Sequence, residues 1–164
     1  MAKQKAITIK GNKEFDFRVY GLLTDDLADF QLALAINHNM RWNLHSYLPL
    51  EDTESEPPYR FDFFGEHNSS GHFQIALWKN WQHDQVFNPE LKNIQYFVRV
   101  TGEWSDLQEK QFLKVLKGIV GPANALKIKL EKLKFADYFM FQIISREQRE
   151  ERNLRAKLRE SVIS

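Results

Sequence analysis

The chain contains no cysteine among its 164 residues. This absence excludes disulfide bonds, thiolate zinc sites and cysteine nucleophiles, and it fits a protein of a reducing compartment. Only seven glycines are present, and none belongs to a glycine-rich loop of the kind that holds phosphate groups. The Gly-x-Ser-x-Gly turn of serine hydrolases is missing as well. We therefore expect a protein that is not an enzyme and that holds no cofactor.

Long apolar runs and an excess of one sign of charge are also absent. No run approaches the roughly 18 apolar residues that a membrane helix needs. Lys10 interrupts the short run 6–9 before a secretory signal can form. The 23 lysines and arginines balance 22 aspartates and glutamates, so the net charge of +1 gives no general attraction to nucleic acids or membranes. These features predict a cytoplasmic protein that does not bind membranes.

The histidines and the acidic residues do not predict a metal site. The five histidines include no pair at the i, i+4 spacing that a helical metal site uses. Four carboxylates lie in the segment 49–58, which ends with Pro57 and Pro58 and which we interpret as a solvated loop. An ion bound there would have to order a loop that has no scaffold, so no metal is expected. These carboxylates are Glu51, Asp52, Glu54 and Glu56.

Apolar residues make up 43% of the chain and aromatic residues 13%, which is enough for one domain with a hydrophobic core. Thr24 is expected to cap a helix that ends near residue 39, and Ser105 with Gln108 forms a capping box for a second helix that ends near residue 117. Strands are predicted at 15–23, 42–47, 59–65, 71–78, 94–101 and 125–130. The residues expected to be buried are Leu27, Phe30, Leu34 and Ile36 in the first helix, and Leu107, Phe112, Val115, Leu116 and Ile119 in the second.

The order β-α-β-β-β-β-α-β predicts an α+β fold with one antiparallel sheet and two packing helices. Two βαβ-like halves in one sheet are typical of a ferredoxin-like or ACT-like sandwich, to which the hairpin 59–78 adds an insertion. We expect residues 1–135 to form this single domain. Residues 136–164 are expected to form a C-terminal helical extension.

Residues 88–96, Asn-Pro-Glu-Leu-Lys-Asn-Ile-Gln-Tyr, resemble the Ile-Pro-Glu-x-x-x-Val-Asp-Tyr signature of the IPExxxVDY family, small proteins of Bacteroidetes with no established function. Residues 15–22 and 118–128 are similar to the family's first strand and its last helix-to-strand turn, so the resemblance covers about residues 5–135. The chain departs from the signature at Asn88, Ile94 and Gln95. If the family's aspartate has a role, Gln95 lacks its charge, and the resemblance implies no activity.

The signature residues have two interpretations. Pro89 and Glu90 shape the start of a strand in which Ile94, Tyr96, Val98 and Val100 share one face, because proline fixes its own φ and keeps the preceding residue out of the helical region. Alternatively, Glu90 or Tyr96 belongs to a binding site. The signature residues carried forward are Pro89, Glu90, Ile94 and Tyr96.

If both helices cover one face of the sheet, the other face is free. The residues assigned to this face are aromatic and basic, as on sheets that stack the bases of single-stranded RNA, although Asp16 and Asp62 dilute the positive charge. Dimerisation, cover by the C-terminal helix, RNA binding and binding of a small ligand are the uses considered. The residues are Arg18, Tyr20, Arg60, Phe64, Trp78, Phe97, Arg99 and Lys127.

The C-terminal helix combines an arginine row with a short apolar stripe. Leu154, Leu158 and Val162 recur at i, i+4 and i+8. This pattern fits a solvated helix with internal ion pairs, or a helix that docks on a second copy, another protein or RNA. The arginines of the row are Arg149, Arg152, Arg155 and Arg159.

Taken together, these patterns favour a binding module that self-associates, as in a dimer, or binds another protein through the free sheet face and the C-terminal helix. The alternatives are binding of single-stranded RNA through the aromatic and basic face, and regulation by a small ligand as in ACT domains.

Overall fold

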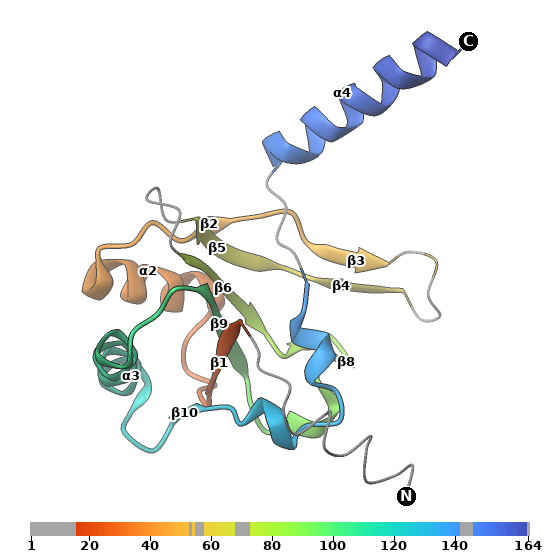
Figure 1. Cartoon of the computed structure of the whole chain (residues 1–164). Helices are drawn as coiled ribbons and strands as arrows, with labels where there is room; N and C mark the ends of the chain where they lie inside the picture. The colour runs from red at the N-terminus through yellow and green to blue at the C-terminus, as the bar shows by residue number, and fades with distance from the viewer. Residues whose placement is uncertain (1–15, 53, 55–57, 68–72, 142–145, 164) are drawn as a thin grey trace, which may run out of the picture.

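The structure, a computed structural model, describes residues 16–52, 54, 58–67, 73–141 and 146–163. Its centre is a six-stranded antiparallel sheet with α2 (Asp29–Met40) and α3 (Asp106–Val120) on one side (Figure 1). The expected α+β fold with an antiparallel sheet is confirmed. The strands in spatial order are β10 (Ala125–Lys127), β1 (Phe17–Leu22), β9 (Tyr96–Gly102), β6 (Phe73–Lys79), β5 (Phe63–His67) and β2 (His45–Ser46).

The face beneath the two helices is apolar because alternate residues of neighbouring strands point toward it. Tyr20, Val98 and Leu77 are direct register partners across β1, β9 and β6, and all three are fully buried. The helices bury Leu32, Ile36, Phe112 and Leu116 against this face. The alternation of Tyr96, Val98 and Val100 expected from the sequence is confirmed, whereas Ile94 precedes the strand and packs on the opposite side of the sheet.

The opposite face, expected to be free, is covered by residues 130–141, which we call the cover segment. It contains the short helices η2 (Leu130–Lys132) and η3 (Ala136–Phe139), and in Figure 1 this blue stretch lies across the sheet from α2 and α3. Phe139 meets Phe97 edge-on with ring centroids 5.0 Å apart, and Phe141 meets Trp78 in the same way at 5.0 Å. Both covered residues are 0% exposed. The face is therefore not free: of the uses considered, cover by the C-terminal region is the one observed, although residues 130–141 and not α4 provide it.

The cover segment also extends the packed part of the chain. Ala136 and Phe139 are buried in the same apolar cluster as Trp78, so packing continues beyond residue 135, where the sequence placed the end of the domain. Four aromatic residues between 135 and 141 give the physical reason, since a segment this apolar gains free energy by leaving water. The helical extension is α4 (Arg146–Ile163), which projects away from the sheet in Figure 1.

Two small hairpins flank the main sheet. β3 (Leu50–Asp52) pairs with β4 (Tyr59–Phe61), and β7 (Trp81–Gln82) pairs with β8 (Gln85–Val86). Part of the segment interpreted as a solvated loop is therefore a strand. The hairpin 59–78 is not an insertion either, because β5 and β6 lie inside the main sheet and β6 pairs with β9. The middle of its expected turn, 68–72, lies outside the described residues.

The sequence predicted the N-terminal cap of α3 correctly and that of α2 incorrectly. The capping box of α3 is confirmed, since Ser105 Oγ accepts from Gln108 N at 3.1 Å and Gln108 Oε1 accepts from Ser105 N at 2.9 Å. In contrast, α2 begins after Ala28, whose N–H donates to Gln31 Oε1 at 2.8 Å, and Thr24 is not its cap. The buried side of α2 is correspondingly different from the prediction: Phe30 and Leu34 are exposed, as is Leu107 in α3.

Candidate functional site

The eight residues assigned to one binding face lie in three places. Register partners share a face, and Tyr20 pairs with Val98 while Gly21 pairs with Phe97, so Tyr20 and Phe97 point to opposite sides. The prediction of a single face is wrong because strand register decides which residues share a face, and the sequence does not specify register. Beneath the helices lie Arg18, Tyr20, Phe64 and Lys127; beneath the cover segment lie Trp78, Phe97 and Arg99; Arg60 is exposed on β4.

Arg18 and Lys127 meet at one carboxylate of α3. Arg18 Nη1 lies 2.5 Å from Glu109 Oε2, and Lys127 Nζ lies 2.9 Å from Glu109 Oε1. The Glu109 side chain is 11% exposed, so this group of charges ties α3 to β1 and β10 beside the Tyr20 hydroxyl. Burial, reinforced by the Glu109 charge, raises the pKa of Tyr20 well above its usual value. The arrangement is explained by packing of the helix on the sheet.

Arg99 fixes the cover segment to the opposite face. Its Nη1 donates to the carbonyl oxygens of Phe139 at 2.7 Å and Phe141 at 2.6 Å, and its guanidinium lies 4.2 Å from the centre of the Phe141 ring. Burial lowers the pKa of Arg99 to about 10, a change that the charge of Asp16 opposes. Trp78, Phe97 and Arg99, three of the side chains expected to contact RNA, are thus occupied within the chain.

The residues around the signature hold the same segment in place. Asn88 accepts from Glu90 N at 3.0 Å through Oδ1 and donates from Nδ2 to the Phe135 carbonyl at 3.3 Å. Glu90 Oε1 accepts from Phe135 N at 2.5 Å. η1 (Pro89–Leu91) begins here, with Pro89 at its first turn. Glu90 therefore holds the backbone of the cover segment rather than pointing into a site.

Asn80 and Tyr96 complete the contacts of this region. Asn80, fully buried, donates from Nδ2 to the carbonyls of Leu91 at 2.7 Å and Ile94 at 3.0 Å. The Tyr96 hydroxyl donates to the Leu27 carbonyl at 2.7 Å, and burial raises the pKa of Tyr96 to about 12. These bonds satisfy buried backbone groups, as buried polar atoms require.

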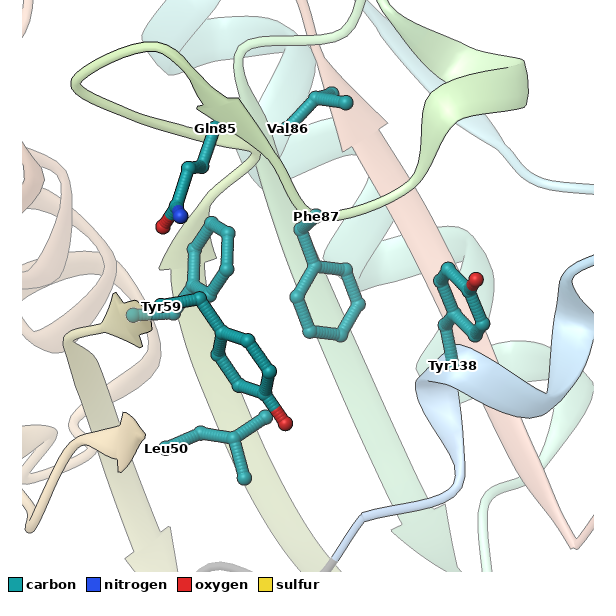
Figure 2. A pocket seen from close by; sticks show the side chains of 7 residues that line it. Leu50, Tyr59, Gln85, Val86, Phe87 and Tyr138 are labelled. Atoms are coloured by element: carbon teal, nitrogen blue, oxygen red, sulfur yellow. The ribbon is translucent and has the colours of Figure 1, made fainter. Parts of the chain in front are cut away.

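An open pocket of about 530 Å³ lies where the two small hairpins meet the cover segment. Figure 2 shows the Phe87 ring between Tyr59 and Leu50 on one side and Tyr138 on the other. Phe61 and Phe87 are buried and meet edge-on at 5.4 Å, whereas Tyr138 is 47% exposed. We call this site the aromatic pocket, and its lining residues are Leu50, Tyr59, Phe61, Gln85, Val86, Phe87 and Tyr138.

The polar groups of the aromatic pocket are few. Gln85 uses its side-chain amide to donate to the Pro58 carbonyl at 2.6 Å, which fixes the β7–β8 hairpin against the β3–β4 hairpin. No carboxylate, imidazole, ammonium or guanidinium group belongs to the described lining. The pocket thus offers apolar and aromatic surface with two tyrosine hydroxyls. Such a lining suits an apolar group.

A smaller pocket of about 200 Å³ lies at the end of the signature. It is polar, and within the described ranges the Lys79 ammonium and the Gln95 side-chain amide have no hydrogen-bond or ion-pair partner. Trp81 supplies an indole whose Nε1 donates to the Lys92 carbonyl at 2.9 Å. We call it the polar pocket, and its lining residues are Thr24, Asp25, Lys79, Trp81, Gln95 and Tyr96.

The residues assigned to the docking helix lie on α4, where every side chain from 148 to 162 is exposed. Leu154 and Leu158 are 59% and 57% exposed, and Arg155 lies 2.5 Å from Glu151 in an i, i+4 ion pair. Among the residues that the structure describes, none of the helices is both long and apolar enough to cross a membrane. The same residues contain no group of three or more His, Asp or Glu side chains that could hold a metal ion.

Sequence reasoning missed the aromatic pocket because its walls come from residues near 50–61, 85–87 and 138, which only the fold brings together. The available signal was the density of aromatic residues on both sides of the acidic segment and after residue 134.

The comparisons add no identification to this geometry: no protein-family model, no curated protein and no solved structure matches the chain.

Proposed function

We propose that this protein is a non-enzymatic protein-interaction module that holds apolar side chains of a protein partner in the aromatic pocket. The observation that carries the proposal is the open apolar lining between two hairpins and the cover segment, with Tyr138 exposed at its edge. Partially exposed tyrosines on a fixed scaffold are common anchors at protein interfaces, because they give a large contact area at a small entropic cost.

The surface around the pocket supports the same proposal. The rings of Tyr138 and Phe135 lie 5.2 Å apart at an angle of 31°, and Met140 is 54% exposed. A chain that exposes several large apolar side chains beside one pocket is expected to use them in contact with another macromolecule. A self-associating partner and a different protein both satisfy this description.

For the fold, we infer a ferredoxin-like arrangement with added hairpins. The order β10-β1-β9-β6 supports it, because β1 lies between the two strands joined by α3, and β9 lies between β1 and β6. Each βαβ unit is thus split by one strand, as in that fold. The resemblance of residues 88–96 to the IPExxxVDY signature agrees with a structural role for this segment, since Glu90 and Tyr96 hold backbone groups.

The test is nuclear magnetic resonance of the ¹⁵N-labelled chain titrated with N-acetyl-leucinamide and N-acetyl-tryptophanamide, which mimic apolar side chains of a partner. We expect the amide signals of Tyr59, Val86 and Tyr138 to shift together and to saturate. Shifts spread over the whole chain, or no shift at all, would contradict the proposal.

Matched variants complete this test. Val86→Asp places a charge in the aromatic pocket and is expected to weaken binding of both probes about tenfold or more, because a buried unpaired carboxylate is costly. Leu107→Asp is the control: Leu107 is 67% exposed on α3 and is absent from the described pocket lining. If both variants bind equally well, the probes do not occupy the aromatic pocket.

The polar pocket favours a second candidate function, binding of a small zwitterion. Lys79 matches a carboxylate, Asp25 an ammonium group, and Trp81 an apolar body. A panel of free amino acids tested by thermal unfolding checks this candidate, with Lys79→Met as the control variant. Unfolding temperatures that no amino acid changes in the wild-type chain would exclude it.

A further inference from the structure

We propose that α4 of a second copy of this chain docks in the aromatic pocket, so that two copies exchange their C-terminal helices. This inference rests on the proposed function, and it names the partner. The structure presents an open apolar pocket and an exposed amphipathic helix in the same molecule. An apolar helix face placed in an apolar groove is a recurring mode of recognition in which residues at i and i+4 act as anchors.

The apolar side of α4 has the spacing that this mode requires. Leu154 and Leu158 stand one turn apart, and Val162 follows one turn later at 85% exposure. At 100° per residue these three side chains share an arc of about 80° on α4. Arg155, ion-paired with Glu151, lies beside the Val162 end of the arc, and Lys157 lies about 60° beyond Leu154. The leucines thus form two neighbouring anchors with basic groups beside them.

Charge complementarity between α4 and the hairpin beside the aromatic pocket indicates that the two leucines dock there. Among the described residues between 51 and 62, at the hairpin beside the pocket, four carboxylates stand against a single Arg60, a net charge of −3; they are Glu51, Asp52, Glu54 and Asp62. The octet 152–159, which contains both leucines, holds three arginines and one lysine without an acidic residue, a net charge of +4. The apolar anchors and the opposite charges therefore occur together on the two surfaces.

The Glu51 carboxylate of the hairpin is suited to this pairing. The Glu51 side chain is 39% exposed and lies 4.0 Å from Arg60, at the outer limit of an ion pair. Arg60 lies nearer to Asp62, at 3.3 Å. Glu51 is therefore weakly paired within its own hairpin, and an incoming basic helix gains from its charge.

A second copy fits better than the helix of the same chain. α4 projects away from the sheet in Figure 1, and all its side chains from 148 to 162 are exposed, so the chain does not cover its own pocket. Exchange between two copies forms the same contact twice around a twofold axis. Each contact then needs to bury only about 800 Å², half of the roughly 1,600 Å² of a standard interface.

The deciding experiment is light scattering after gel filtration of full-length variants at low salt. The wild-type chain is expected to be a dimer, and Leu154→Asp/Leu158→Asp and Val86→Asp are expected to be monomers at the same concentration. Leu107→Asp carries the same change at an exposed leucine on α3 and is expected to remain a dimer. A dimer that survives both the α4 and the pocket variants would overturn the inference.

Charge reversal identifies the two partner surfaces directly. Glu51→Lys/Glu54→Lys and Arg155→Glu/Lys157→Glu are each expected to weaken self-association about tenfold or more, since like charges then face each other. A mixture of the two variants restores opposite charges at both contacts of the exchanged dimer, so heterodimers are expected to form. A mixture that stays monomeric would contradict the exchange.

The remaining outcomes separate this inference from the proposed function. A wild-type monomer whose α4 amides are protected from hydrogen exchange would show that the helix covers the pocket of its own chain, which overturns the exchange. A wild-type monomer with unprotected α4 that still binds N-acetyl-leucinamide at Val86 would overturn the exchange and leave the interaction module standing. A monomer that binds neither probe would overturn both.

Discussion

The guanidinium group of Arg99 in β9 donates a hydrogen bond of 2.7 Å to the carbonyl oxygen of Phe139, 40 residues further along the chain. The same nitrogen reaches the Phe141 carbonyl at 2.6 Å. Arg99 is 3% exposed and projects from the sheet face that Trp78 and Phe97 occupy. A basic residue expected to meet a nucleic acid or a partner thus binds the backbone of its own cover segment.

Replacement of Arg99 by methionine is expected to destabilise the fold by about 2–4 kcal/mol. The change leaves the carbonyls of Phe139 and Phe141 without this donor, at about 1–3 kcal/mol for each buried group, while removing a buried charge offsets part of the loss. Urea unfolding followed by tryptophan fluorescence measures the effect. Arg60→Met is the control, because Arg60 is exposed and its ion pairs are worth little, so its change should stay within about 0.5 kcal/mol. Equal losses in both variants would mean that Arg99 does not hold the cover segment.

Glu90 offers a test of the signature segment. Glu90→Ala removes the acceptor of the Phe135 amide and is expected to cost about 1 kcal/mol, whereas Glu90→Gln keeps an acceptor oxygen and should cost less than half of that. Hydrogen exchange of the Phe135 amide is the direct measurement, and it should become faster in the alanine variant alone. Exchange that is unchanged in Glu90→Ala would show that this bond does not protect the cover segment.

Local signals in the sequence predicted those parts of the fold that depend on neighbouring residues. Ser105 and Gln108 satisfy each other three residues apart, and the alternation of Tyr96, Val98 and Val100 defines one face of β9 without reference to other strands. Thr24 is a good capping residue by type, but α2 starts after Ala28, four residues later, where the Ala28 N–H donates to Gln31 Oε1. Propensity was outweighed there by a specific side-chain contact.

The candidate site depended on relationships that no local pattern contains. Whether Tyr20 joins Phe97 or Val98 is decided by strand register, and a shift of one residue moves a side chain to the other face. The aromatic pocket needs Tyr59, Phe87 and Tyr138 to converge from three elements. The burial of Trp78 beneath Phe141 likewise depends on the path of the chain after β10. Composition indicated aromatic binding surface, and only tertiary structure locates it.

Tyr96 is expected to make stability depend on pH in the alkaline range. Its pKa is raised from 10.0 to about 12 in the folded protein, mainly by burial. Between these values the folded protein keeps a proton that the unfolded chain loses, so the free energy of unfolding falls as the pH rises. The contribution is complete below pH 10 and lost near pH 12, and it amounts to about 2–3 kcal/mol.

The measurement for Tyr96 is urea unfolding of the wild-type chain and of Tyr96→Phe at several pH values from neutral to 12. At neutral pH the variant should be about 1 kcal/mol less stable, because the hydrogen bond to the Leu27 carbonyl is lost. The difference should shrink and then reverse as the pH passes 10, since phenylalanine has no proton to lose. The titration of Tyr20 and of the lysines cancels in the comparison because both chains contain these residues. Stability curves that stay parallel over the whole pH range would contradict a raised pKa of Tyr96.

Truncation separates the two parts of the C-terminal region. A chain that ends at residue 141 is expected to keep its unfolding free energy within about 0.5 kcal/mol, at concentrations where only monomers exist, because the α4 side chains from 148 to 162 are exposed. A chain that ends at residue 129 loses Phe139 and Phe141 and exposes Trp78 and Phe97, each of which gains about 1.5–3 kcal/mol from burial. We expect this shorter chain to lose its cooperative urea transition and to bind an apolar dye. Cooperative unfolding of both truncated chains would show that residues 130–141 are dispensable for the core. Loss of the cooperative transition in both chains would show that α4 contributes to the stability of the monomer.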